Sequence, residues 1–235
     1  MITISPIDFE FQYFERMAIM NYDVILFDLD GTLTDSTEGI INSVIYALER
    51  KNISYTSKKE LHRFVGPPLQ SSFRDYCGFG EDEAKDAVRV FREYFTQKGI
   101  YENAVYEGVA EMLNALYTSG FTLAVATSKP EAFAEQILTR FDLAKYFNVI
   151  AGASMEGTDK PTVIRQALAR LEMEPSSRVL MVGDREHDIL GAKEVGISSL
   201  GVLYGYGSEK ELSKAGADYI AKKTEDILKI LSGNE

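Results

Sequence analysis

The stretch FDLDGTLTDS, residues 27–36, decides how this chain is interpreted. An apolar run at 24–27 leads directly into two aspartates, Asp28 and Asp30, which are separated by a single residue. The end of a buried strand is an unfavourable place for carboxylates, because charge is expensive to bury without a partner. The pattern therefore indicates either a bound cation or carboxylates that take part in a reaction.

Short runs rich in β-branched residues recur along the chain and alternate with helical patterns. The expected strands cover residues 24–28, 122–127, 149–151, 179–182, 199–203 and 218–220. The expected helices cover residues 106–119, 131–141, 162–171 and 189–195. Strands that alternate with helices predict a parallel sheet covered on both faces. The predicted fold class is therefore α/β, with a doubly wound, Rossmann-like core.

The connection after the first expected strand is far longer than an ordinary crossover. It contains two amphipathic patterns, GIINSVIYALERK at 39–51 and EDEAKDAVRVFREYF at 81–95, each with its apolar residues on one helical face. We therefore expect an all-helical cap subdomain at residues 37–104, inserted into a core made of residues 20–36 and 105–235.

Residues 1–19 precede the expected core and include Asp8, Glu10 and Glu15. A segment without a basic start and with acids in its middle does not have the pattern of a secretory signal. Two interpretations of this segment stay open. It is either an extension on a core that starts near Met20, or an edge element packed through its aromatic side chains.

The composition argues against several classes of function. Hydrophobic residues make up 45% of the 235 residues, which predicts a folded core rather than disorder. The formal net charge of −11 argues against a nucleic-acid polymer as partner, since phosphate backbones require a basic surface. The single cysteine, Cys77, excludes an internal disulfide and suits a reducing, cytoplasmic compartment. No apolar run approaches the about 18 residues of a membrane span, so no membrane partner is expected.

Polar residues stand at the carboxyl ends of the expected strands, where open parallel sheets bind their ligands. Asp28 follows the first strand and Thr127 ends the second. Asp184 and Asp188 follow the fourth strand in LMVGDREHD, and Lys160 precedes that strand in GTDKPTVI. A carboxylate cluster can hold Mg²⁺, which prefers oxygen ligands, and a hydroxyl with an ammonium can neutralise phosphoryl oxygens.

Taken in order, these motifs resemble the four motifs of the haloacid dehalogenase-like hydrolase superfamily. The motifs are DLDGTLTDS, the threonine of LAVATSKP, the lysine of DKP, and GDREHD. The resemblance runs from about Tyr22 to the C-terminus. The chain is similar to phosphoglycolate-phosphatase-like members with a helical cap, and most of all to bacterial 5'-nucleotidase-like members, through FVGPPL, LAVATSKPE and LYGYGS.

The resemblance implies a Mg²⁺-dependent phosphatase that works through an aspartyl-phosphate. Asp28 is expected to be the nucleophile, and Asp30 the general acid and then the base. The resemblance places Mg²⁺ on Asp28, the backbone carbonyl of Asp30, and Asp184. Asp188 is expected to orient Lys160 or a metal-bound water.

A further set of residues is expected from the resemblance to bind the phosphoryl oxygens. The members of this set are Gly31, Thr32, Thr127, Ser128 and Lys160. Lys129, in TSKP, is the alternative to Lys160, because the stretch MEGTDKP is shorter than the matching loop of similar proteins. Relatives often place a cis-proline after the motif lysine, so a cis bond between Lys160 and Pro161 is predicted.

The cap is expected to recognise whatever is attached to the phosphate. The stretch HRFVGPPLQSSFRDYCGFG, residues 62–80, combines cations with aromatic residues, and Arg63, Gly66 and Pro67 are its candidate substrate-binding residues. Aromatic surface would stack on a nucleoside base, whereas a converging cation would hold the carboxylate of phosphoglycolate. A nucleoside 5'-monophosphate is the favoured substrate, and phosphoglycolate is the alternative.

Two further functions compete with a phosphatase. A sugar phosphomutase shares both aspartates, but the familiar mutases carry a histidine in the first cap helix, and residues 36–51 have none. A catalytically idle binding module is disfavoured because the full set of motif residues is present. The oligomeric state, monomer or dimer, stays open.

Overall fold

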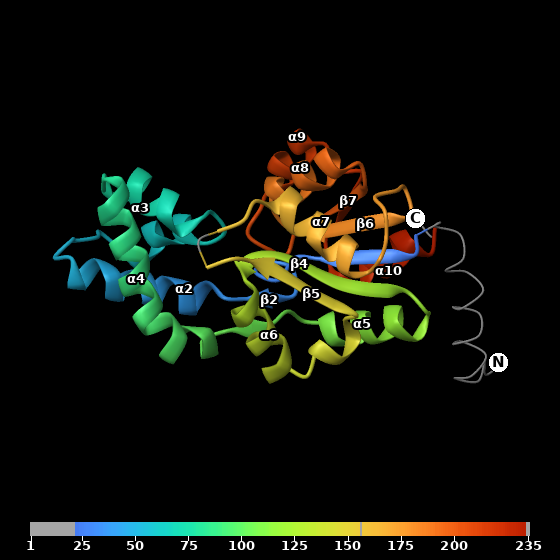
Figure 1. The fold of residues 1–235 in the computed structure, drawn as a ribbon, viewed down its shortest axis with the longest axis horizontal. Helices are drawn as coiled ribbons and strands as arrows, with labels where there is room; N and C mark the ends of the chain where they lie inside the picture. Colours follow the sequence, from blue (N-terminus) through green and yellow to red (C-terminus); the bar gives the residue numbers. More distant parts are fainter. Residues whose placement is uncertain (1–21, 156, 234–235) are drawn as a thin grey trace, which may run out of the picture.

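The computed structural model describes residues 22–155 and 157–233, so the expected extension at residues 1–19 lies outside the described residues. One six-stranded sheet, in the order β5-β4-β1-β6-β7-β8, forms the centre of the core, and all its neighbouring strands are parallel (Figure 1). The strands are β1 (Val24–Phe27), β4 (Thr122–Pro130), β5 (Val149–Ala153), β6 (Val179–Gly183), β7 (Ser198–Val202) and β8 (Tyr219–Ala221). The predicted α/β class with a parallel sheet is confirmed.

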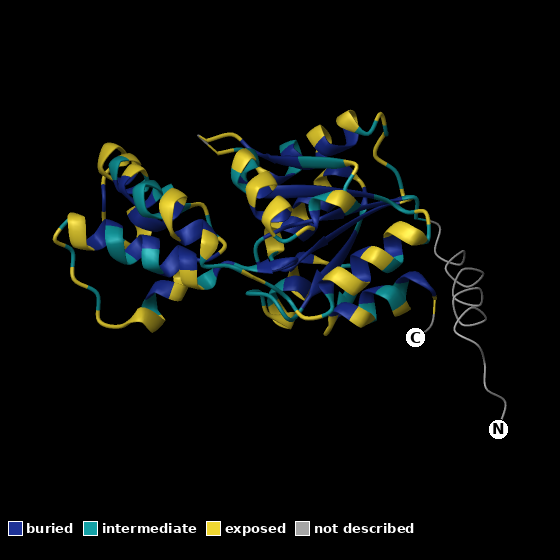
Figure 2. Ribbon diagram, turned by 90° about the horizontal axis from the view of Figure 1, so that it is seen from below, coloured by how far each residue is buried: buried dark blue, intermediate teal, exposed yellow. Residues whose placement is uncertain are grey.

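Helices cover both faces of this sheet, and the exposed residues lie on the outer sides of these helices (Figure 2). The core helices are α5 (Val109–Thr118), α6 (Glu131–Arg140), α7 (Lys160–Arg170), α8 (Glu186–Val195), α9 (Glu209–Ala215) and α10 (Thr224–Leu231). Strand β1 shows why two covered faces are needed. Its residues alternate between two apolar clusters, with Ile25 and Phe27 in one and Val24 and Leu26 in the other. Among the described residues, no helix has the length and apolar character that a membrane crossing requires.

A separate group of helices lies beyond one end of the sheet, at the left of Figure 1, and is called the cap below. Its elements are α2 (Thr37–Arg50), η2 (Lys58–Phe64), α3 (Leu69–Cys77), α4 (Glu81–Gln97) and η3 (Gly99–Tyr101). The apolar face of α2, which includes Ile40, Val44 and Leu48, is buried in the same cluster as Ala84 and Phe91 of α4. The apolar faces of the two cap helices thus pack together, in the same apolar cluster that includes Ile25 and Phe27 of β1.

Two short strands carry the chain into the cap and out of it. β2 (Thr34–Asp35) and β3 (Ala104–Val105) pair in antiparallel fashion. Close by, the backbone N–H of Gly39 donates to the carbonyl of Glu102, at 3.1 Å. Both chain crossings between core and cap therefore lie side by side.

The prediction of a cis bond between Lys160 and Pro161 is wrong, because no peptide bond among the described residues is cis. Pro161 lies in the first turn of α7, after the N-cap residue Asp159. A proline in that turn has helical φ already, and its missing N–H has no partner to lose within the helix. A trans proline is therefore well suited to this position.

Gly39 provides a test of how tightly α2 packs against η3 within the cap. A Cβ at this position would overlap the backbone carbonyl oxygen of Gly99. Gly39→Ala is therefore expected to lower the free energy of unfolding by about 1–3 kcal/mol through overpacking, although alanine normally favours a helix by about 1 kcal/mol over glycine. Urea denaturation measures the change. Gly80→Ala is the control, since a Cβ there meets nothing within 4 Å. Equal unfolding free energies for Gly39→Ala and the parent chain would contradict this close packing of α2 against η3.

Candidate active site

Strand β1 ends directly before Asp28 and so places this residue at the carboxyl edge of the sheet. All four β1 residues are buried, and the strand lies between β4 and β6. The backbone N–H of Asp28 donates to the carbonyl of Val182 on β6, at 2.9 Å, which extends the ladder by one residue. The chain then turns sharply at Gly31, whose φ of +88° and closeness to the Asp184 carboxylate exclude a side chain. The turn after Asp28 is thus folded against a second acid.

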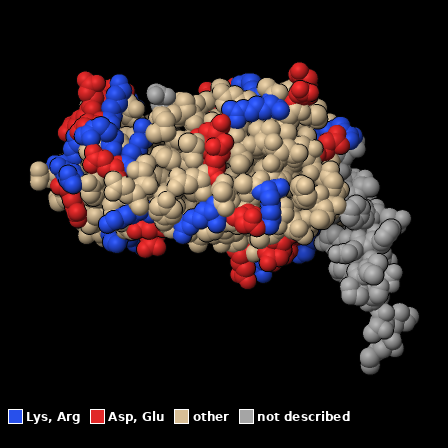
Figure 3. Space-filling view, turned by 60° about the horizontal axis from the view of Figure 1, so that its bottom comes forward, with Lys and Arg blue, Asp and Glu red and all other residues tan. Residues whose placement is uncertain are grey.

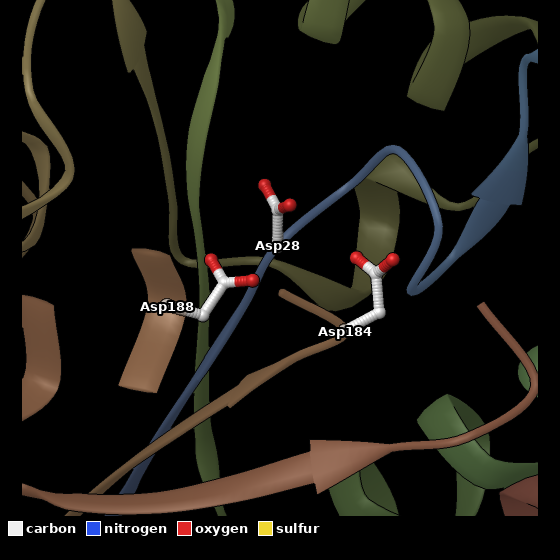
Figure 4. Close-up of side chains that lie close together, drawn as sticks. All are labelled: Asp28, Asp184 and Asp188. Carbon is white, nitrogen blue, oxygen red and sulfur yellow. The ribbon is translucent and has the colours of Figure 1, made fainter. Parts of the chain in front are cut away.

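Three carboxylates from distant parts of the chain converge at this edge (Figure 4). Asp28 follows β1, Asp184 follows β6, and Asp188 lies in the first turn of α8. Each offers a carboxylate oxygen within 4.8 Å of the others, and all three residues are buried. Asp28 and Asp184 were predicted to hold Mg²⁺, and Asp188 to orient Lys160 or a metal-bound water; the structure brings these three acids together, and their roles stay predictions. The Asp30 side chain is not part of the cluster, and only the backbone carbonyl of Asp30 was predicted to bind the metal.

Lys160 places its ammonium inside this cluster. Its Nζ lies 2.9 Å from Asp28 Oδ1 and 2.7 Å from Asp188 Oδ1, and it donates to the carbonyl oxygen of Ala126 at 3.0 Å. Burial by itself would lower the pKa of Lys160, but the two carboxylates outweigh burial and raise it. Lys160 therefore stays charged, and it joins the nucleophile candidate to the first turn of α8.

The charges of the cluster do not balance without a further cation. Three carboxylates surround one ammonium, which leaves two formal negative charges in excess when all four groups are ionised. Burial, together with the Asp188 and Asp28 carboxylates, raises the pKa of Asp184 well above its ordinary value. Hard oxygen donors with excess negative charge are the ligands that a divalent cation such as Mg²⁺ takes. The residues present therefore fit this ion.

The loop that contains LYGYGS wraps around Asp184 and ties it to the entrance of the cap. The backbone N–H of Tyr206 donates to Asp184 Oδ2 at 2.8 Å, while the phenol oxygen of Tyr206 lies 3.2 Å from Asp35 Oδ1. The same phenol accepts from the backbone N–H of Ser36, at 3.0 Å. Burial raises the pKa of Tyr206, which keeps the phenol neutral. The sequence analysis did not assign Tyr206 a role, and the quoted loop was the only signal for it.

The end of β4 carries the remaining core candidates. Thr127 is buried, and its hydroxyl oxygen accepts from the backbone N–H of Lys129 at 3.2 Å. Ser128 is exposed, so its side chain is not drawn into the buried cluster with Thr127. The structure also separates the two candidate lysines, because Lys129 pairs with Asp30 Oδ2 at 2.6 Å rather than with Asp28. Lys160, not Lys129, accompanies the three clustered carboxylates.

The candidates nearest Asp28 are placed by the turn that follows it. Thr32 is buried, and its hydroxyl donates to Asp184 Oδ1 at 3.4 Å. The backbone N–H of Gly31 already donates to the carbonyl of Thr34, and that of Thr32 to Leu29. These two N–H groups hold the turn together in the described structure, so their predicted contact with a phosphoryl group stays a prediction.

A cavity of about 480 Å³ lies between the cap and the core. It is lined by His62, Arg63, Val65, Pro67, Tyr76, Arg185, Gly205 and Tyr206. Arg185, the residue after Asp184, reaches across to the cap, where its Nη1 lies 3.5 Å from the Val65 carbonyl oxygen. An ion pair of 2.7 Å with Glu211 holds the other side of this guanidinium. Sequence reasoning missed Arg185, although the residue stands inside the GDREHD motif.

The structure sorts the aromatic residues of the stretch at 62–80. Phe64, Phe73 and Phe79 are buried in the cap core. Tyr76 is 37% exposed and lines the cavity, with the Arg63 guanidinium 4.5 Å from its ring centroid. Of the Phe and Tyr residues in this stretch, Tyr76 is therefore the one that lines the cavity, and the Arg63 guanidinium covers part of its ring. Of the other two cap candidates, Pro67 lines the cavity, and Gly66 lies against the Arg185 guanidinium.

The surface charge around these elements is mixed. Lys and Arg alternate with Asp and Glu at the cap end of the face in Figure 3, and no continuous basic tract crosses the described part of that face. The cations paired with the acids of the site are instead Lys160, which contacts Asp28 and Asp188, and Lys129, which contacts Asp30, within a chain of formal net charge −11. Local cations thus offset the overall negative charge at the site itself.

Comparisons with known proteins agree with this arrangement. The model of the haloacid dehalogenase-like hydrolase family matches residues 25–202. A 5'-nucleotidase of Pseudomonas aeruginosa is 46% identical over 199 residues, which cover 84% of this chain and 90% of the relative. The tyrosine-protein kinase PtkA of Mycobacterium bovis is 39% identical, covering 87% of this chain and 67% of its own length. A phosphoglycolate phosphatase of Vibrio parahaemolyticus is 30% identical, and the match covers 92% of this chain and 99% of the relative.

A solved structure leads to the same family. The crystal structure of a predicted phosphatase from Clostridium acetobutylicum superposes with a TM-score of 0.85 at 46% identity, and the match covers 89% of this chain and 98% of that one. The family model spans the carboxylate cluster, Lys160 and the whole cap. The chain therefore belongs to the haloacid dehalogenase-like hydrolase family, and within it to the phosphatases, which are phosphoric monoester hydrolases.

Proposed function

We propose that the chain is a Mg²⁺-dependent phosphatase for small phosphate monoesters, with nucleoside 5'-monophosphates as its substrates. One observation carries the proposal: Lys160 joins Asp28 and Asp188 beside Asp184, at the carboxyl edge of the sheet. A nucleophilic carboxylate and a neutralising ammonium are what transfer of a phosphoryl dianion requires. The reaction is assigned to the cytoplasm, because a chain with one cysteine suits a reducing compartment.

The proposed reaction has two steps. In the first, Asp28 attacks phosphorus, the bond to the alcohol oxygen breaks, and Asp30 gives its proton to that oxygen. In the second, a water molecule attacks the aspartyl-phosphate, Asp30 takes the proton of the water, and Asp28 is released. Lys160 and Thr127 stabilise the charge on the phosphoryl oxygens. Mg²⁺, held by Asp28, Asp184 and the Asp30 carbonyl, supplies Lewis-acid stabilisation of that charge when bound.

The proposed substrate class rests on the cavity beside the acidic cluster. A volume of about 480 Å³ suits a nucleoside better than the two carbons of phosphoglycolate. The ring of Tyr76 with the Arg63 guanidinium offers a platform on which a base can stack. The relative named 5'-nucleotidase supports this choice, and the relative named phosphoglycolate phosphatase makes that ester the runner-up.

Removal of the nucleophile tests the proposed mechanism. Asp28→Asn keeps the shape of the side chain, but it is expected to lower kcat on p-nitrophenyl phosphate by at least about 1,000-fold, because covalent catalysis and cation binding fail together. Borohydride trapping followed by mass spectrometry should detect the aspartyl-phosphate in the parent chain only. Asp142→Asn is the control, at an exposed aspartate paired with Lys145. Normal turnover by Asp28→Asn would refute the mechanism. An assay with ATP and a tyrosine peptide tests the kinase activity named for one relative.

A bound cation is expected to offset the repulsion among the clustered carboxylates and so to raise the stability of the chain. In EDTA, Asp184→Asn should be at least as stable as the parent chain, because the change removes one of three like charges. Mg²⁺ at about 100 times its Kd should stabilise the parent chain by about 2.7 kcal/mol, whereas the variant should gain much less. Thermal unfolding with and without Mg²⁺ measures both effects. A Mg²⁺ response of Asp184→Asn equal to that of Asp142→Asn would place the cation elsewhere.

The position of Tyr76 in the cavity leads to a separate prediction about substrate specificity. Tyr76→Ala is expected to lower kcat/KM for nucleoside 5'-monophosphates by about tenfold, or about 1.4 kcal/mol, through the loss of stacking. The same change should alter kcat/KM for phosphoglycolate by less than about twofold, since that ester has no ring. Tyr117→Ala, at a tyrosine on α5 that is 51% exposed and does not line the cavity, is the matched control. Equal losses on both substrates, or a tenfold preference of the parent chain for phosphoglycolate, would overturn the nucleotide assignment.

A further inference from the structure

Lys129 is a buried cation that the proposed mechanism does not use. It follows Thr127 by two residues near the end of β4, where the register with β5 shifts between Thr127 and Pro130. Thr127 and Lys129 are both buried while Ser128 between them is exposed. The Lys129 side chain reaches from the end of β4 to Asp30, in the segment that follows β1.

The surroundings of Lys129 hold its ammonium in one place. Its side chain is 6% exposed, and Nζ lies 2.6 Å from Asp30 Oδ2. The ammonium also lies 5.0 Å from the ring centroid of Phe95, on the cap helix α4. Phe95 itself packs against Phe91 and Phe133, with ring centroids 5.5 Å apart in each case. A lysine is tolerated at this depth because a carboxylate and an aromatic face both partner it.

The two oxygens of Asp30 have unlike surroundings. Oδ2 accepts the hydrogen bond from Lys129, whereas Oδ1 is buried and has no hydrogen-bond partner among the described residues. A donor on one oxygen of a carboxyl group leaves the other oxygen to carry the proton in the acid form. The same free oxygen accepts the proton in the base form. The Lys129 contact therefore determines which oxygen of Asp30 exchanges protons.

We propose that Lys129 is the positioning residue for Asp30, and that it reserves Asp30 Oδ1 for proton transfer to the leaving alcohol and from the hydrolytic water. This inference rests on the proposed function, because it assigns a role within the same reaction. Lys129 does not touch the substrate and acts only through Asp30. Because Lys129 also contacts Phe95, the position of Asp30 depends in turn on a residue of the cap.

Leaving groups of different basicity test this role. An alkoxide must be protonated as it departs, whereas p-nitrophenolate leaves readily without a proton. Lys129→Met should therefore lower kcat/KM for a nucleoside 5'-monophosphate by about 100-fold, within the usual contribution of general acid catalysis. It should lower kcat/KM for p-nitrophenyl phosphate by less than about fivefold. Because kcat/KM covers the steps up to release of the alcohol, a change in the later hydrolysis of the phosphoenzyme does not obscure the comparison.

The controls separate positioning from charge and from folding. Asp30→Asn should show the same dependence on the leaving group, and the double variant should lose no more than Asp30→Asn alone. Lys145→Met removes an exposed lysine that pairs with Asp142, and it should leave kcat/KM unchanged for both substrates. Lys129→Gln, which keeps an N–H donor, should recover part of the loss; it replaces Lys129→Met if thermal unfolding shows that the latter is not folded.

The possible results are distinguishable. Equal losses on both substrates, or additive losses in the double variant, would overturn the inference and make Lys129 a phosphoryl-binding or purely structural residue. Failure of the parent chain to hydrolyse either ester would instead refute the proposed function. A loss confined to the nucleotide, shared with Asp30→Asn and absent from Lys145→Met, would support the positioning role.

Discussion

The mutual repulsion of three buried carboxylates is the interaction on which the rest of this structure depends. Asp28, Asp184 and Asp188 are brought within 4.8 Å of one another by three different segments. Such a cluster is unfavourable unless cations accompany it. Lys160 supplies one of them from the start of α7, and the remaining negative charge makes the cluster suitable for a divalent cation. The repulsion among these carboxylates thus both destabilises this part of the fold and suits it to bind a cation.

Much of the surrounding structure serves to hold these acids in place. Gly31 lets the turn after β1 close against Asp184, and the Tyr206 N–H group fixes one oxygen of Asp184. The backbone N–H of Arg185 donates to Asp188 Oδ2 at 3.1 Å, which leaves the other oxygen of Asp188 for Lys160. Backbone donors of this kind add no mobile charge, so they orient the carboxylates without neutralising them. A rigid acidic site results.

The core and the cap contribute different residues to the site. The core holds the acids and Lys160, whereas the cap contributes Tyr76 and Arg63 to the cavity and Phe95 to the surroundings of Lys129. Because Tyr76 and Phe95 both belong to the cap, a displacement of the cap would alter the cavity and the surroundings of the Lys129–Asp30 pair together. Tyr206 connects the crossing at β2 to Asp184, since its phenol contacts Asp35 and its backbone N–H donates to Asp184.

The pattern of residues along the chain was enough to predict the parallel sheet, the helices after its first strand, and the acids Asp28, Asp184 and Asp188. Apolar runs mark strands, and the carboxyl ends of parallel strands meet at one edge. Helices α9 and α10 were not predicted, because they are short. Three further features became visible only in the folded chain: Lys160 rather than Lys129 contacts Asp28, Lys129 contacts Asp30, and Tyr76 rather than Phe73 lines the cavity. These choices depend on which side chains meet across elements distant in the chain, and periodicity describes each element alone.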